Sequence, residues 1–388
     1  SDAAMVDLLL KSGADPNATF GEGETALMTA ARTGNLAIVK ALLAAGAKVN
    51  VSETWRGQTP LMWAAAEGHV QVVEALIAAG AEINARSKAS FTPFLFAVRE
   101  GRMDVAKKLI AAGVSPNETL TASGRRGNTS ALVLAVSNAH FELASMLLDA
   151  GADPNANING WTALHIISDV RKPGAGSNDP APDGSGSMDS LEMVRRLVAK
   201  GANINGRTTK TKNVGLTSLN TAGATPFLLA ARTDDAELMR LLVKLGADPL
   251  IPTNDGSTPL MVAAGVGTRS PGEDAGLEPE ALEAVKLAVE LGGDVNAVDK
   301  NGETAMHGTA YKWMPTVAQF LVDHGAKPQI WNQKNSHGWT ALRIADGVHR
   351  GMNLRRSPET AVVLRKSLQA AGLSTEVEPE TGISGSTK

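Results

Sequence analysis

Seven histidines are the residues of this sequence best suited to acid–base or metal chemistry near neutral pH. They are His69, His140, His165, His307, His324, His337 and His349. No two of them have the spacing of a metal-binding pair on a helix, and no Gly-x-Ser-x-Gly turn or Walker-type phosphate loop accompanies them. His165 and His307 each stand three residues after a threonine, and His69 and His140 occupy one recurring turn, so we interpret these four as hydrogen-bonding residues of turns. We therefore expect a protein that is not an enzyme and holds no cofactor.

Three aspartates in a Gly- and Ser-rich segment are the second candidate for chemistry. Asp179, Asp183 and Asp189 lie in the stretch SNDPAPDGSGSMDS and offer oxygen ligands of the kind that calcium prefers. Their spacing does not match the EF-hand loop, which has ligands at alternate positions and a closing glutamate. We favour a solvated loop in which Asp189 caps the following helix, SLEMVRRLVAK, and keep a metal site as the weaker alternative.

Composition narrows the class of partner. The chain has 388 residues, no cysteine and a formal net charge of -3, so disulfides and thiolate chemistry are excluded and nothing favours a nucleic-acid partner. No apolar run approaches the roughly 18 to 20 residues that cross a bilayer, and we expect no membrane insertion. The absence of cysteine gives a weak preference for a periplasmic or secreted location, with the cytoplasm as the alternative.

The elements that position these residues follow a repeat. A polar residue followed by Pro or Ala and often Leu recurs at Thr25, Thr59, Thr92, Ser130, Thr162, Thr225, Thr258, Thr304 and Thr340. After each such anchor comes a helical pattern with small residues, such as Ala64 and Ala65, and then a second apolar pattern, such as Val72, Val73 and Leu76. The second pattern ends in Gly-Ala in most copies, where glycine can adopt the left-handed conformation that closes a helix. Each copy is therefore a predicted helical pair.

These copies resemble the ankyrin repeat, whose pattern is close to Asp-x-x-Gly-x-Thr-Pro-Leu-His-x-Ala-Ala-x-x-Gly-His, an apolar helix, then Gly-Ala-Asp-x-Asn-Ala. The resemblance covers about residues 5–372 and is best in residues 57–84 and 299–326. It implies an all-α solenoid of stacked helix pairs with β-hairpin fingers. We expect a single solenoid over residues 1–373, with about nine full units and a partial N-terminal unit, and a disordered tail over residues 374–388.

Five segments interrupt the regular repeat. Residues 171–188, 267–278 and 347–356 are inserted between the first and second helix of their copies, and we expect them along one edge of the stack. Residues 118–128 and 206–223 lengthen the finger side and carry Arg125, Arg126, Lys210 and Lys212. These inserts make the chain similar to bacterial ankyrin proteins. Neutral length variation and a binding edge are both open interpretations of the inserts. The first half-copy, residues 5–17, lacks a first helix, which predicts an upstream segment or a frayed cap.

The resemblance implies that a partner docks on the concave surface formed by finger tips and first helices. The candidate contacts are aromatic or cationic residues at these positions: Trp55, Phe91, Trp161, Tyr311, Trp331, Trp339, Lys312, Arg32, Arg99 and Arg232. Aromatic and Arg anchors carry much of the energy of protein recognition, although the rings could instead pack against neighbouring fingers.

We expect a non-catalytic, monomeric protein–protein interaction module that binds a partner protein or another domain of the same polypeptide. The alternative is a ligand-binding protein whose Trp-bearing fingers hold a carbohydrate or another flat small molecule, because a row of indole rings can stack on such ligands. A change of Trp fluorescence on adding a glycan would favour the alternative.

Overall fold

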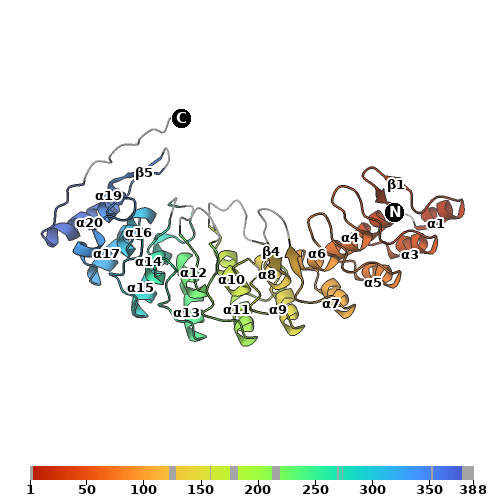
Figure 1. Ribbon diagram of the computed structural model, residues 1–388, viewed down its shortest axis with the longest axis horizontal. Coiled ribbons are helices and arrows are strands. Elements are labelled where there is room, and N and C mark those ends of the chain that lie inside the picture. The colour runs from red at the N-terminus through yellow and green to blue at the C-terminus, as the bar shows by residue number, and fades with distance from the viewer. Residues whose placement is uncertain are drawn as a thin grey trace. The chain divides into compact units, whose positions relative to one another are not determined.

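The computed structural model describes residues 3–121, 128–157, 159–174, 182–211, 219–268, 271–272, 274–350 and 353–377. These residues form twenty helices and three two-stranded hairpins, which makes the fold all-α (Figure 1). The chain divides into two compact units: unit 1 contains Ser1–Ala163 and Pro182–Ala202, and unit 2 contains Leu164–Ala181 and Asn203–Lys388. A single stack over residues 1–373 stays a prediction.

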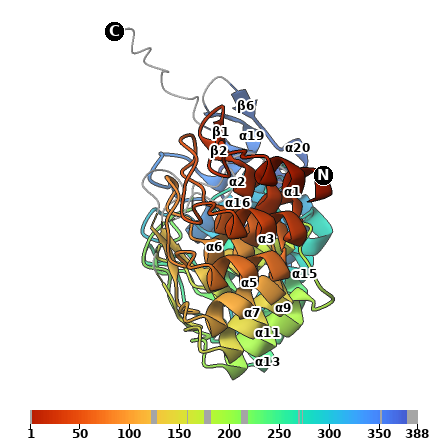
Figure 2. The ribbon, with the colours of Figure 1, turned by 90° about the vertical axis from the view of Figure 1, so that its right-hand side faces the viewer.

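Unit 1 holds one lone helix, then four helix pairs and the second helix of a fifth copy. The helices are α1 (Ala3–Lys11), α2 (Ala26–Thr33), α3 (Leu36–Ala44), α4 (Pro60–Glu67), α5 (Val70–Ala78), α6 (Pro93–Arg99), α7 (Met103–Ala111), α8 (Ala131–Ser137), α9 (Phe141–Asp149) and α11 (Ser190–Ala199). Its hairpins pair β1 (Thr19–Phe20) with β2 (Glu24–Thr25), and β3 (Thr119–Thr121) with β4 (Asn128–Ser130). First helices contact first helices and second helices contact second helices, as the row α3, α5, α7 in Figure 2 shows.

Unit 2 repeats this arrangement with more irregular copies. Its helices are α10 (Ala163–Arg171, which begins at the last residue of unit 1), α12 (Pro226–Arg232), α13 (Ala236–Lys244), α14 (Pro259–Ala263), α15 (Glu278–Glu290), α16 (Ala305–Lys312), α17 (Pro315–Asp323), α18 (Pro328–Trp331), α19 (Ala341–Asp346) and α20 (Pro358–Ala370). An antiparallel hairpin of β5 (Val348–Arg350) and β6 (Asn353–Arg355) lies between α19 and α20, with His349 opposite Leu354. The first helices α12, α14, α16 and α19 contact one another in sequence order.

The repeated anchor residues begin the first helices. The Thr59 hydroxyl accepts the backbone N–H of Met62 at 3.4 Å, and Pro60 occupies the first turn, where its missing N–H costs nothing. The same side-chain cap is present at Thr25, Thr92, Ser130, Thr225, Thr258 and Thr340. Such a cap contributes roughly 1 kcal/mol, so the repeated Thr is explained by the start of each helix.

The core has the composition that the repeat pattern predicts. Ala64 and Ala65 of α4 are fully buried, and their small side chains let neighbouring first helices approach closely. Val72, Val73 and Leu76 of α5 are also buried and fill the space between the layers. A single helical pair is too thin to bury these residues alone, so each copy depends on its neighbours.

Two further predictions concern the chain as a whole. Among the residues described, no helix is long and apolar enough to cross a membrane. Residues 374–377 form no helix or strand, and the remainder of the predicted disordered tail, residues 378–388, lies outside the described residues.

Candidate functional site

Backbone hydrogen bonds join neighbouring fingers within each unit. In unit 1, the Thr54 N–H donates to the Glu22 carbonyl at 2.7 Å, and the Lys88 N–H donates to the Arg56 carbonyl at 2.9 Å. The corresponding bonds in unit 2 run from Asn254 to Ala222 at 2.9 Å, from Lys300 to Asp255 at 2.8 Å and from Ser336 to Asn301 at 2.7 Å. These bonds hold the joined fingers in place, so that side chains on their tips have a fixed support.

A second set of links uses the asparagine that follows Gly-Ala. The Asn50 amide donates to the Gly80 carbonyl at 3.1 Å and accepts the Glu82 N–H at 2.9 Å, so one side chain satisfies two backbone groups of the next copy. The residues that make one or both of these bonds are Asn17, Asn50, Asn117, Asn155, Asn205 and Asn296. These links were not predicted from sequence, although the recurrence of the asparagine at one position was the available signal.

The four repeat histidines are structural, as predicted. The Nε2 atoms of His69 and His140 lie 3.0 and 2.9 Å from the carbonyls of Arg32 and Arg99 in the preceding copies. His165 and His307 contact the carbonyls of Gly206 and Gln333 at 2.9 and 3.2 Å. Burial lowers the pKa of His165 and of His307 to about 4, so both rings are neutral at pH 7.

The aspartates considered as metal ligands do not converge in the described part of the chain. Asp189 accepts the Glu192 N–H at 2.7 Å and caps α11, as predicted. Asp179 lies outside the described residues, and within them no group of three or more His, Asp or Glu residues could hold a metal ion. The structure therefore offers no support for the weaker metal alternative.

In unit 1, the exposed aromatic residues lie on the first two fingers. The Phe20 side chain is 83% exposed and that of Trp55 67% exposed, and the Arg56 guanidinium lies 4.1 Å from the centre of the Trp55 ring. On the adjoining first helices, the Arg32 guanidinium lies 5.3 Å from the half-buried Trp63 ring. We name this group of Phe20, Trp55, Arg56, Arg32 and Trp63 the finger face; the sequence analysis included only Trp55 and Arg32.

The expectation that the other finger aromatics are solvated is wrong for Phe91 and Trp161. Each is only 4% exposed. The Phe91 ring packs 5.1 Å from Phe96 and receives the Arg99 guanidinium at 4.9 Å. Phe91 therefore packs on the first helix of its own copy rather than on a neighbouring finger, and half-buried Arg99 serves the same packing.

Unit 2 buries three more of the predicted contact residues. Trp331 is 1% exposed, and Tyr311 lies in a polar cluster in which its hydroxyl donates to Glu303 at 3.0 Å and accepts from Asn335 at 2.8 Å. Lys312, the third, is 8% exposed. Trp339 differs, because it is half-buried and stacks on His337 at 5.0 Å. The buried rings are covered by helices and by polar partners: Phe91 packs on α6, and Trp331 lies in helix α18.

Lys312 and Arg232 belong to a network of charges at the turns between first and second helices of unit 2. The Lys312 ammonium lies 2.5 Å from the Asp234 carboxylate and donates to the Ala275 carbonyl at 2.8 Å. Arg232 pairs with Asp169 at 2.8 Å, so both cations are neutralised by this chain. Burial raises the pKa of the Asp234 carboxyl well above its usual range, although Lys312 opposes this effect.

The same network includes the beginning of the first insert. Arg171 pairs with Asp235 at 2.6 Å, and Lys172 pairs with Glu280 at 2.8 Å and donates to the Asp234 carbonyl at 3.0 Å. We name Asp234, Lys312, Asp235, Arg171, Lys172 and Glu280 the turn cluster. Its pairs join residues far apart in sequence, which is why sequence analysis did not find it.

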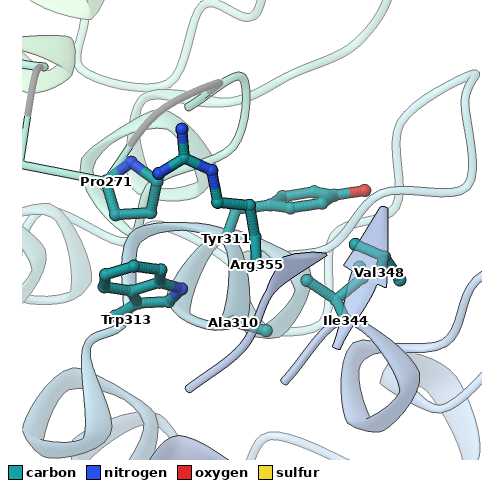
Figure 3. Close-up of a pocket in the computed structure, with 7 residues that line it drawn as sticks. All are labelled: Pro271, Ala310, Tyr311, Trp313, Ile344, Val348 and Arg355. Atoms are coloured by element: carbon teal, nitrogen blue, oxygen red, sulfur yellow. The ribbon is translucent and has the colours of Figure 1, made fainter. Parts of the chain in front are cut away.

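Side chains of the second and third inserts meet at a small pocket. Figure 3 shows Pro271 of the second insert and Val348 and Arg355 of the third around Tyr311 and Trp313 at the end of α16. Together with Arg171 and Lys172 of the turn cluster, this pocket places residues of all three inserts at the helix-turn edge of unit 2, whereas residues 182–188 of the first insert belong to unit 1. One shared edge along a single stack stays a prediction. Lys210 is exposed, whereas Arg125, Arg126 and Lys212 lie outside the described residues.

Comparison with known proteins identifies the family. A family model described as "Ankyrin repeats (3 copies)" matches residues 1–87, 92–171 and 185–269, and one described as "Ankyrin repeat" matches residues 159–209. The first model alone covers more than half of the chain. The protein therefore belongs to the ankyrin repeat family, whose members are generally protein–protein interaction modules and typically not enzymes.

Individual relatives are more distant. B-cell lymphoma 3 protein homolog from Mus musculus is 28% identical over 250 residues, which cover 64% of this chain and 44% of that protein. Ankyrin repeat and SOCS box protein 16 from Mus musculus is 26% identical over 230 residues, covering 53% and 45%. The chain thus spans less than half the length of these curated relatives.

The crystal structure of the human ASB11 ankyrin repeat domain matches with a TM-score of 0.49 and 22% identity, over 68% of this chain and 98% of that one. This likeness carries no argument about function. The relatives named are from animals, so the similarity to bacterial ankyrin proteins stays a prediction.

Proposed function

We propose that this chain is a non-catalytic protein-binding module and that its partner, another protein or another domain of the same polypeptide, docks on finger tips and first helices, chiefly on the finger face of unit 1. The observation that carries the proposal is the exposure of Phe20 and Trp55 on two neighbouring fingers. Exposed apolar groups gathered on one surface commonly mark a protein interaction site. Their fingers are tied by the Thr54–Glu22 hydrogen bond, so docking would require little ordering of the backbone.

The composition of the finger face supports a protein partner. Tryptophan and arginine are the residues most enriched at the energetic centres of protein interfaces, and Arg32 and Arg56 both lie over indole rings here. Of the residues predicted from sequence, Trp55, Arg32 and half-buried Arg99 remain available in unit 1, and Trp339 in unit 2. Burial of Phe91, Trp161 and Trp331 interrupts the row of rings on which the carbohydrate alternative depended, so we do not favour that alternative.

The test is capture of a partner by the full chain and by a Phe20→Ser/Trp55→Ser variant. Both side chains are exposed, so the thermal midpoint should not change, while two interface anchors lost together should weaken binding by at least about tenfold. Photo-cross-linking from position 56 followed by mass spectrometry would identify the partner, and titration of that purified partner would give the two dissociation constants.

The matched control is Leu250→Ser, which removes a half-exposed apolar side chain from unit 2. We expect it to bind like the unchanged protein. Equal affinity of the double variant and the control for the identified partner would refute a binding role for the finger face.

A further inference from the structure

The Arg355 side chain at the end of β6 is half-buried, and one nitrogen of its guanidinium lacks a hydrogen-bond partner. Its Nε atom is buried, and among the described residues neither a hydrogen-bond acceptor nor a carboxylate contacts the side chain. A buried donor without an acceptor costs roughly 1–3 kcal/mol, and more when the group is charged. Arg365 of α20, by contrast, pairs with Asp346 at 2.6 Å. Arg355 has no such counter-ion among the described residues.

The pocket at Arg355 has apolar and aromatic walls. Trp313, Tyr311, Ile344 and Val348 line it, and Figure 3 shows the Arg355 guanidinium extending beside Pro271 on the side where the Trp313 ring lies. The pocket is partly open to solvent and has room, ≈ 10 Å³, for about one water-sized group. An occupant could therefore enter only with a small group, such as one carboxylate oxygen, while its remaining atoms stay at the mouth.

Trp313 is held in an unusual backbone conformation at this pocket. Its φ is +62°, in the left-handed region, where the corresponding turns of the first three copies have Gly34, Gly68 and Gly101. Such a conformation costs a non-Gly residue about 1 kcal/mol or more, and strain of this kind is concentrated at binding sites. Here the strained residue supplies a wall of the pocket and remains 39% exposed.

The insert that carries Arg355 is strongly basic. Residues 347–356 include His349, Arg350, Arg355 and Arg356 and contain no Asp or Glu, in a chain whose net charge is -3. Leu354, opposite His349 in the hairpin, is 52% exposed. A guanidinium binds a carboxylate through two parallel hydrogen bonds, which are strongest where water is excluded. One small pocket with apolar walls suits a protein carboxylate better than a nucleic-acid backbone, which requires a longer track of cations.

We propose that Arg355, the Trp313 pocket and the β5–β6 hairpin form a second docking site, which binds an acidic segment of a partner protein with one Asp or Glu carboxylate placed on the Arg355 guanidinium. This site is built from the helix-turn edge of unit 2 and uses no residue of the finger face. Binding at this second site does not depend on whether the finger face binds a partner.

The test measures binding of a fluorescein-labelled poly-glutamate peptide to the full chain by fluorescence anisotropy at low salt, with labelled oligothymidylate as a second probe. The Arg355→Gln variant removes the guanidinium without breaking an internal ion pair, so it should fold normally and bind the peptide about tenfold more weakly. Trp313→Gly keeps a turn that glycine readily forms and removes the wall, and should weaken binding similarly.

The matched control is Arg240→Gln, which removes one exposed cation that pairs with Glu283 in unit 2. We expect its affinity for the peptide to equal that of the unchanged protein. Three results would overturn the proposal: no binding of the peptide by the unchanged protein, equal loss in Arg240→Gln and Arg355→Gln, or oligothymidylate binding as tightly as the peptide.

Discussion

The turns between first and second helices differ between regular copies and copies that precede an insert. In the regular copies the left-handed residue is Gly34, Gly68 or Gly101, and a side chain of the next copy occupies the space where a Cβ atom would lie. In the copies that precede the three inserts, the left-handed residue is Ala139, Asp234 or Trp313.

In two of these three cases a glycine of the insert, instead of a glycine of the turn, makes the close contact. Gly184 packs against Ala139 in unit 1, and Gly276 packs against Asp234 in unit 2, each so closely that a Cβ atom on the glycine would clash. In the third case Trp313 turns its ring to the pocket that Val348 and Arg355 line. Glycine is therefore required at these turns by the neighbouring copy and not by the turn alone. Where an insert follows, the left-handed turn position can carry a side chain. In unit 2 these side chains, Asp234 and Trp313, contact residues of the turn cluster and of the insert pocket.

The largest expected effect comes from breaking the turn cluster with Lys312→Met. This change leaves the buried Asp234 carboxylate without its counter-charge, and breaking a buried ion pair in this way costs roughly 3–5 kcal/mol. Urea unfolding followed by circular dichroism should show the loss, and hydrogen exchange should place it in unit 2.

Two further variants sharpen this comparison of the units. Asp234→Asn/Lys312→Met removes both charges and keeps a residue that tolerates left-handed φ, so it should recover most of the stability. Lys108→Met, which breaks the exposed Lys108–Glu74 pair of unit 1, should leave the unfolding free energy unchanged. Equal effects of the two single variants would show that the turn cluster does not stabilise unit 2.

Acid should destabilise unit 2 through His165 and His307. Their folded pKa is about 4, below the ordinary 6.5, so the unfolded chain takes up the protons first as the pH falls. Their contribution is complete above about pH 6.5 and is lost between about pH 6.5 and 4, by up to about 3 kcal/mol for each ring.

The raised pKa of Asp234 acts in the opposite direction, because the folded state then keeps a proton that the unfolded state loses as the pH rises. The measurement is therefore the unfolding free energy of the unchanged protein minus that of His307→Gln at each pH. The contribution of Asp234 is the same in both proteins and cancels in this difference. A difference that stays constant from pH 7 to pH 4.5 would contradict the neutral, buried state of His307.

The smallest expected effect tests whether the neighbouring copy is what requires glycine at the turn. Gly34→Ala places a Cβ atom 2.5 Å from His69 Nδ1, in addition to the strain of φ +74°. Gly46→Ala has the same kind of strain, with φ +88°, but meets nothing within 4 Å. We expect losses of about 2 and about 1 kcal/mol, measured by thermal unfolding, because only the first change displaces the His69–Arg32 hydrogen bond. Equal losses would mean that the neighbouring copy does not dictate the glycine.

The repeat fold could be predicted from sequence because its determinants are local. The Thr anchors cap helices within three residues, and Ala64 or Leu76 needs only its own periodicity to be assigned to the core. The positions of the inserts could be predicted for the same reason, since each interrupts a recognisable pair of helices.

Exposure and ion pairing could not be predicted, because they depend on neighbouring copies. Trp55 and Phe91 are both finger aromatics in the sequence, yet one is 67% and the other 4% exposed. Lys312 was expected in solvent, but its partner Asp234 lies 78 residues earlier in the chain. The replacement of glycine by Ala139, Asp234 and Trp313 at the turn of the copy before each insert is a signal that the sequence itself carries.

The asparagine links have a consequence for how the stack comes apart. Asn50 hydrogen-bonds the Gly80 carbonyl and the Glu82 N–H of the next copy. When the copy that contains Asn50 unfolds, its neighbour loses both hydrogen bonds, so unfolding spreads from copy to copy. Asn50→Ala should therefore uncouple the first copies of unit 1 and reduce the steepness of the urea transition, the m-value, as well as its midpoint. The repeated asparagine thus sets how many copies of unit 1 unfold as one cooperative block.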